Sequence, residues 1–120
     1  MSMNVKRAVR VADQLQRELA TMLQAGRIKD PRLHSITITG VKLTDDLRLA
    51  RVYYVLRGDE QAKADALKGL QSAKGFLRRE IGQIMRLKYS PDFQFFYDGS
   101  FDYAERIETL LHQIKKDEID

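Results

Sequence analysis

The spacing of apolar residues changes along the chain from helical to strand-like and back again. Between Val5 and Leu23 apolar residues recur every three or four positions, whereas residues 35–57 are alternating or rich in β-branched and aromatic side chains. A chain with both patterns buries the helical stripes against a sheet. We therefore predict an α+β fold, and 120 residues suit a single domain, 1–120, with one core.

The first strand pair is predicted to form a β-hairpin. Ile36 and Ile38 alternate with threonines, and Gly40 then shifts the apolar phase by one residue, which indicates a strand with a glycine bulge. Thr-Asp-Asp at 44–46 is a turn sequence, and residues 47–57 resume a strand. We interpret these two aspartates as turn formers and not as paired catalytic carboxylates.

A third strand is predicted at residues 93–97, with Phe93 and Phe95 facing the core. The pattern does not determine how this strand joins the hairpin. A three-stranded sheet covered mainly on one face by helices is the simplest way to bury the apolar stripes. A last helix is predicted at about 100–116, with Ser100 as its N-cap.

Residues 60 to about 88 are predicted to be helical, with Asp59 as the N-cap. The apolar stripe is interrupted at Ala73, Lys74 and Gly75. Because glycine inside a helix costs about 1 kcal/mol relative to alanine, we expect Gly75 to mark a kink or a break between two helices.

The composition excludes several chemistries. There is no cysteine, and no Gly-rich phosphate loop or dinucleotide fingerprint occurs. The two histidines, His34 and His112, do not belong to a metal-spaced cluster. We expect no enzymatic activity, no cofactor and no metal. The chain also lacks a membrane-spanning run and an apolar leader, so we expect a soluble cytoplasmic protein without membrane partners.

Positive charge is concentrated in the first three quarters of the chain. Residues 1–88 hold 18 Lys and Arg against 9 Asp and Glu, whereas residues 89–120 hold 3 against 8. Clustered basic side chains displace counterions from phosphate backbones, so the basic part is the candidate polyanion-binding surface. Arg79 and Arg86, seven residues apart, are predicted to share one helical face. The proposed phosphate-contacting residues are Arg7, Arg10, Arg17, Lys74, Arg78, Arg79 and Arg86.

Five segments resemble the bacterial ribosome-binding factor A family. They are RAVRVA at 7–12, KDPRL at 29–33, DLRLARVY at 46–53, LQSAKGFLR at 70–78 and PDFQFFYDGS at 91–100. The resemblance implies a type II KH-like fold. No GxxG loop, the backbone clamp of nucleic-acid-binding KH domains, occurs in the sequence. The family's Ala-x-Gly kink falls on Ala73, Lys74 and Gly75.

The resemblance also implies a function in assembly of the small ribosomal subunit. Such a factor binds the free or immature 30S subunit, contacts 16S rRNA and promotes late maturation of the ends of that RNA. Family membership further implies a link to growth in the cold and release by a ribosome-dependent GTPase. We expect a monomer.

Two other functions compete with this hypothesis. A protein-interaction adaptor would use the basic surface to bind acidic protein partners and would have little affinity for ribosomal RNA. A small RNA-processing enzyme would need a metal cluster or a base and nucleophile pair, and the sequence offers neither.

Overall fold

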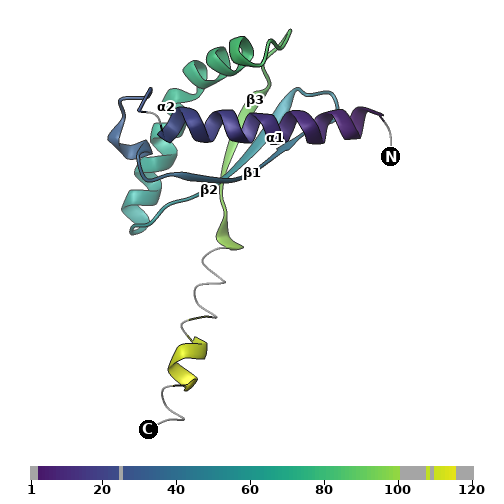
Figure 1. Cartoon of the computed structure of the whole chain (residues 1–120). Helices are drawn as coiled ribbons and strands as arrows, with labels where there is room; N and C mark the ends of the chain where they lie inside the picture. Colours follow the sequence, from purple (N-terminus) through teal and green to yellow (C-terminus); the bar gives the residue numbers. More distant parts are fainter. Residues whose placement is uncertain (1–2, 25, 101–107, 109, 116–120) are drawn as a thin grey trace.

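The fold combines two long helices with a three-stranded sheet. The computed structural model describes residues 3–24, 26–100, 108 and 110–115. Its elements, in chain order, are α1 (Met3–Gln24), the 3₁₀ helix η1 (Pro31–Leu33), β1 (Thr37–Leu43), β2 (Leu49–Val55), α2 (Glu60–Ile84) and β3 (Asp92–Tyr97). The predicted α+β class and element order are confirmed (Figure 1). None of the described helices is long and apolar enough to cross a membrane.

The sheet is mixed, with β2 in the centre. β1 pairs with β2 in antiparallel orientation and β3 pairs with β2 in parallel orientation. The register between β1 and β2 shifts between Ile38 and Gly40. This confirms the predicted bulge, which places Ile38 and Val41 on the same, core-facing side of β1.

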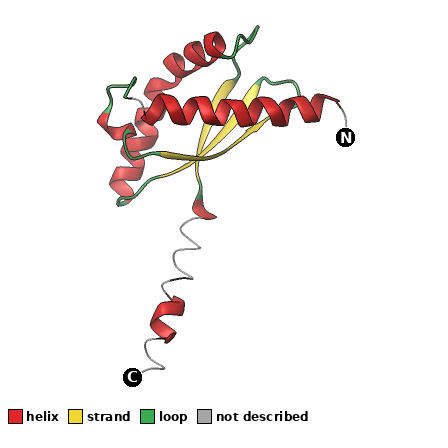
Figure 2. Ribbon diagram, in the orientation of Figure 1, coloured by secondary structure: helices red, strands yellow, loops and turns green. Residues whose placement is uncertain are grey.

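Both long helices pack on one face of the sheet. The stripe predicted for α1, from Ala8 to Met22, is buried. Leu15 and Leu19 of α1 belong to the same core as Leu77 of α2 and as Val52 and Phe93 of the sheet. Figure 2 shows α1 crossing in front of the three strands. Phe93 is fully buried and Phe95 packs against the core, as predicted.

The helix α2 is continuous from Glu60 to Ile84, so a break at Gly75 is wrong. The ribbon bends partway along its length (Figure 1), and a kink at Ala73, Lys74 and Gly75 stays a prediction. Asp59 caps the helix as predicted, because its carboxylate accepts a hydrogen bond of 2.9 Å from the Ala62 amide. Gly75 does not have a positive φ, and nothing lies within 4 Å of a Cβ built on it. Its backbone conformation is therefore open to other residues.

Close packing between α2 and η1 requires the glycine at position 69. A Cβ there would lie 2.9 Å from Cδ2 of the buried Leu33 and 3.3 Å from Cβ of Arg32, both in η1. Asp30 starts this short helix by accepting a hydrogen bond from the Arg32 amide, and Pro31 follows as its first residue. The 29–33 segment thus packs directly against the backbone of α2 at Gly69.

The end of α2 differs from the prediction. The helix stops at Ile84, and Arg86 adopts a left-handed conformation with φ of 52°. The Leu87 amide then bonds to the Gly82 carbonyl at 3.0 Å, and Leu87 packs against the core. Arg79 and Arg86 therefore do not share a helical face, because Arg86 lies beyond the helix.

Most of the C-terminal helix predicted at about 100–116 lies outside the described residues. The described ones, 108 and 110–115, are helical and exposed. Residues 99 and 100 are also helical, and the Asp98 carboxylate accepts hydrogen bonds from the Ser100 amide (3.1 Å) and hydroxyl. Asp98, and not Ser100, therefore holds the capping position.

Alanine at Gly69 and at Gly75 is expected to have opposite effects on stability. Gly69→Ala should lower the melting temperature, because overpacking against η1 costs about 1–3 kcal/mol and outweighs a helix-propensity gain of about 1 kcal/mol. Gly75→Ala should raise the free energy of unfolding by up to about 1 kcal/mol, because its methyl group meets no other atom. Urea unfolding followed by circular dichroism measures both. Equal stabilisation by the two substitutions would contradict the packing described for Gly69.

Candidate nucleic-acid interface

A cleft of about 550 Å³ opens at one end of the sheet. The start of α1, the β1–β2 turn and the connection from α2 to β3 meet there (Figure 1). Its lining is basic, with four cationic side chains against two carboxylates. The lining residues are Arg7, Asp46, Leu47, Arg48, Arg78, Leu87, Lys88, Tyr89, Ser90 and Asp92.

The β1–β2 turn positions Arg48 at this cleft. Asp46 accepts hydrogen bonds from the Thr44 hydroxyl (2.6 Å) and the Arg48 amide (3.0 Å). These bonds, the one to Thr44 foremost, hold the pKa of the Asp46 carboxyl below its ordinary value. Leu47 has a φ of 61°, which allows the chain to reverse. Asp46 thus forms the turn, as predicted, and its carboxylate, which forms no ion pair with a described residue, lies close enough to Arg48 for the two charges to attract each other.

The second carboxylate of the cleft is also occupied. Lys74 Nζ lies 3.2 Å from Asp92 Oδ1, and this bond is the main reason that the pKa of Asp92 is lowered. The Lys74 ammonium thus neutralises Asp92 and links α2 to the start of β3. Arg78 Nε donates to the Pro91 carbonyl at 3.2 Å, which fixes its guanidinium beside the cleft.

Three cationic side chains of the cleft form no ion pair with a carboxylate of the described residues. Among the described residues, Arg7, Arg48 and Lys88 have no ion-pair partner. The Lys88 ammonium lies 5.6 Å from the ring centroid of Tyr89, which is 77% exposed. Uncompensated cations beside an exposed aromatic ring can contact phosphate oxygens and a base together. Across the part of the chain that the structure describes, no three metal-ligating side chains lie together.

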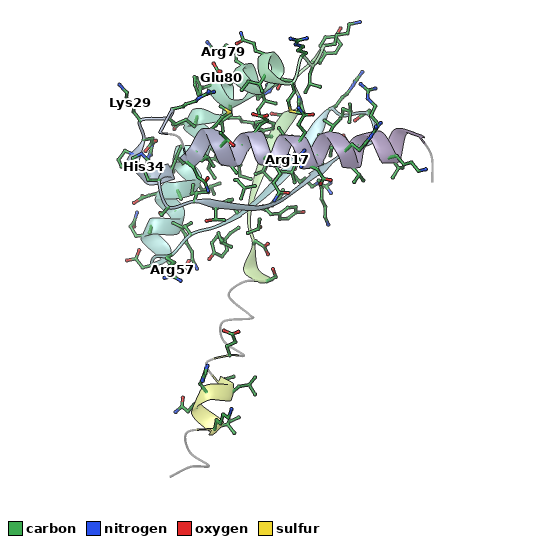
Figure 3. All side chains as sticks on the ribbon, in the orientation of Figure 1. Arg17, Lys29, His34, Arg57, Arg79 and Glu80 are labelled. Carbon is green, nitrogen blue, oxygen red and sulfur yellow. The ribbon has the colours of Figure 1, made fainter. Side chains whose placement is uncertain are left out.

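The structure places the seven predicted basic residues at different sites. Lys74 pairs with Asp92, and Arg86 is exposed beyond α2, outside the cleft lining. Arg7 and Arg78 meet in the cleft, far apart in sequence. Arg10 and Arg17 on α1 and Arg79 on α2 are exposed outside its lining. Figure 3 shows Arg17 on α1 and Arg79 near the upper end of α2. Contact of these seven residues with RNA stays a prediction.

Arg48 and Lys88 line the cleft, but neither belongs to the seven residues that the sequence predicts to contact phosphates. Arg48 lies within the DLRLARVY segment, directly after the turn. Its position beside a turn-forming aspartate is the one sequence feature that indicates an exposed basic residue at the end of the hairpin. Lys88 lies only two residues beyond Arg86 in the same basic stretch. Neither position indicates by itself that the two residues face one cleft.

A small α+β fold with a basic cleft beside its sheet offers a surface that is suited to polyanions. The sequence profile described as Ribosome-binding factor A matches residues 7–111. Ribosome-binding factor A of Syntrophobacter fumaroxidans is 48% identical over 118 residues, covering 97% of this chain and 100% of the relative. That of Geobacter sulfurreducens is 49% identical over 109 residues, covering 91% and 92%. The chain belongs to the ribosome-binding factor A family.

Solved structures of the family share the fold. The crystal structure of ribosome-binding factor A from Thermus thermophilus matches with a TM-score of 0.65 at 29% identity, over 75% of this chain and 94% of that one. A homology model of Thermus thermophilus ribosome-binding factor A, fitted into the cryo-EM map of a 30S–RbfA complex, matches with a TM-score of 0.59 at 30% identity, over 73% of this chain and 91% of that one.

Replacing Lys74 by glutamine is expected to raise the pKa of Asp92 toward its ordinary value, because the main bond that stabilises the carboxylate is lost. A carboxyl NMR titration measures this shift. With its folded-state pKa lowered, Asp92 contributes stability above its unfolded-state pKa and loses it as the pH falls through the folded-state value. The stability difference between the two proteins should therefore shrink in acid. Lys68→Gln, an exposed change on the same helix, is the control and should leave the Asp92 pKa unchanged.

Proposed function

We propose that this chain is a non-enzymatic assembly factor that binds the free or immature 30S subunit and promotes late maturation of 16S rRNA. The family membership carries this proposal, because the chain matches its relatives over nearly their whole length. A structural neighbour of the same family was fitted into the map of a 30S complex, which supports the same partner here. The protein would act in the cytoplasm as a monomer and leave the subunit with the help of a ribosome-dependent GTPase.

The basic cleft supports RNA as the part of the subunit that is contacted. Its two carboxylates are bound within the protein, so Arg7, Arg48 and Lys88 remain available for phosphates. Arg78 adds a guanidinium whose Nε is already fixed by Pro91. A protein-interaction adaptor stays the alternative, and it predicts little affinity for subunits stripped of proteins.

Charge reversal in the cleft tests the proposal. Arg7→Glu/Arg48→Glu should weaken binding to purified 30S subunits by about tenfold or more, because two charge-assisted contacts are lost. The slope of log affinity against log salt should fall by about two. Fluorescence anisotropy at several salt concentrations measures both quantities.

The control is Lys29→Glu/Arg57→Glu, which changes the net charge equally. Both residues are exposed and lie at the end of the molecule away from the cleft (Figure 3). This variant should keep near wild-type affinity. Equal losses in both double variants would mean that net charge, and not the cleft, determines binding. No binding of the wild-type protein would contradict the proposed function itself.

The maturation step has its own expected outcome. Cells that lack the protein should accumulate 16S rRNA precursors with unprocessed ends, more strongly at low temperature, and primer extension detects these ends. The wild-type gene should restore processing, whereas Arg7→Glu/Arg48→Glu should not. Fully matured ends in the deletion strain would limit the function to subunit binding.

A further inference from the structure

Among the residues that the structure describes, no helix packs on one of the two faces of the sheet. The core-facing residues of β2 alternate with Arg51, Tyr53 and Val55, which point to the opposite face. Both long helices pack on the core side. Within the described part of the chain, residues 108 and 110–115 are also exposed and cover nothing. The second face of the sheet is therefore a surface.

Two aromatic rings lie together on this open face. Tyr53 of β2 and Phe96 of β3 are register partners, and their rings are stacked with centroids 5.6 Å apart and an interplanar angle of 29°. Phe96 is 42% exposed. Because β3 is an edge strand, no further strand flanks Phe96 on the side away from Tyr53. Its ring is thus supported on one side and open on the other.

Basic side chains surround the aromatic pair. Lys42 of β1 lies with its ammonium 5.8 Å from the ring centroid of Tyr53, and Lys42 is the register partner of Arg51. Both basic residues are exposed. Gln94, the β3 partner of Arg51, adds an exposed amide. Asp92, at the start of β3, is bound to Lys74, and Asp98, two residues after Phe96, accepts hydrogen bonds from the Thr39 hydroxyl (2.7 Å) and from Ser100.

Sheet pairing alone does not require this composition. A cross-strand aromatic pair stabilises a sheet, but it does so best when it is buried against a neighbouring layer. Here the aromatic pair is open to solvent and flanked by cations. An exposed ring on a sheet with adjacent cations matches the chemistry of single-stranded RNA, which offers a flat base between phosphates.

We propose that the open sheet face is a second RNA-binding surface, separate from the cleft. An unpaired nucleobase stacks on the exposed ring of Phe96, which Tyr53 supports from behind, and the flanking phosphates contact Lys42 and Arg51. The inference rests on the proposed function only for its choice of RNA as the partner. The open sheet face would supply a contact for single-stranded RNA in a chain whose sequence has no GxxG clamp.

Binding of a fluorescein-labelled uridine hexanucleotide tests the surface. Phe96→Leu should weaken binding by about tenfold, because a leucine side chain keeps the apolar volume but offers no π-face. Phe76→Leu is the matched control, since Phe76 is 37% exposed on α2 and belongs to neither surface. It should bind as the wild type does. Equal affinity of Phe96→Leu and wild-type protein would overturn the proposal.

The location of binding is tested without any substitution. In an amide NMR titration of the wild-type protein with the hexanucleotide, the largest shifts should fall on Lys42, Arg51, Tyr53, Gln94 and Phe96. Shifts confined to the cleft, or no shifts at all, would overturn the proposal; the second result would leave the open face to a protein partner. This readout holds even if Phe96→Leu lowers stability.

The two RNA proposals fail in different ways. Arg7→Glu/Arg48→Glu should lose affinity for 30S subunits yet keep its hexanucleotide shifts on the sheet. If the cleft variant keeps its affinity for subunits while Phe96→Leu loses the hexanucleotide, the cleft is excluded and the sheet surface is supported. The reverse result excludes the sheet surface and leaves the proposed function intact.

Discussion

β2 hydrogen-bonds to a neighbour on each side, and its alternate residues, Ala50, Val52 and Tyr54, are buried. The two other strands pair with β2, and both long helices share a core with its buried residues. The bulge in β1 brings Val41 opposite Val52, and the parallel pairing brings Phe95 opposite the same residue. Because these side chains all point to one face, both long helices must pack there. The opposite face is left with the polar and aromatic residues that alternate with the core.

The basic cleft exists because carboxylates near it are bound within the protein. Asp46 bonds within its own turn, and Asp92 accepts from Lys74. Each carboxylate therefore shapes the local structure, and neither forms an ion pair with Arg48 or Arg78. The same contacts that build the turn and fix the sheet edge thus determine which charges face solvent.

Local patterns predicted most of the architecture. The stripe of α1, the bulge at Gly40 and the Asp59 cap are all determined by residues a few positions apart, so they could be read from the sequence. The end of α2 could not. Arg86 takes a left-handed conformation without a glycine, and the chain then turns so that the partly buried Leu87 packs against the core. The close contact at Gly69 could not be predicted either, since only the position of η1 in the folded protein reveals it.

The sequence by itself determined the α+β class, the order of the elements from α1 to β3, the excess of positive charge before residue 89 and, through its motifs, the resemblance to the family. The tertiary structure determined which of the basic side chains lie close together in the cleft. Arg7, Arg48, Arg78 and Lys88 come from separate segments and meet only when α1, the turn and the end of α2 are packed. Helical and strand periodicity records which side of an element is buried, but the distance between two exposed side chains depends on the packing of whole elements.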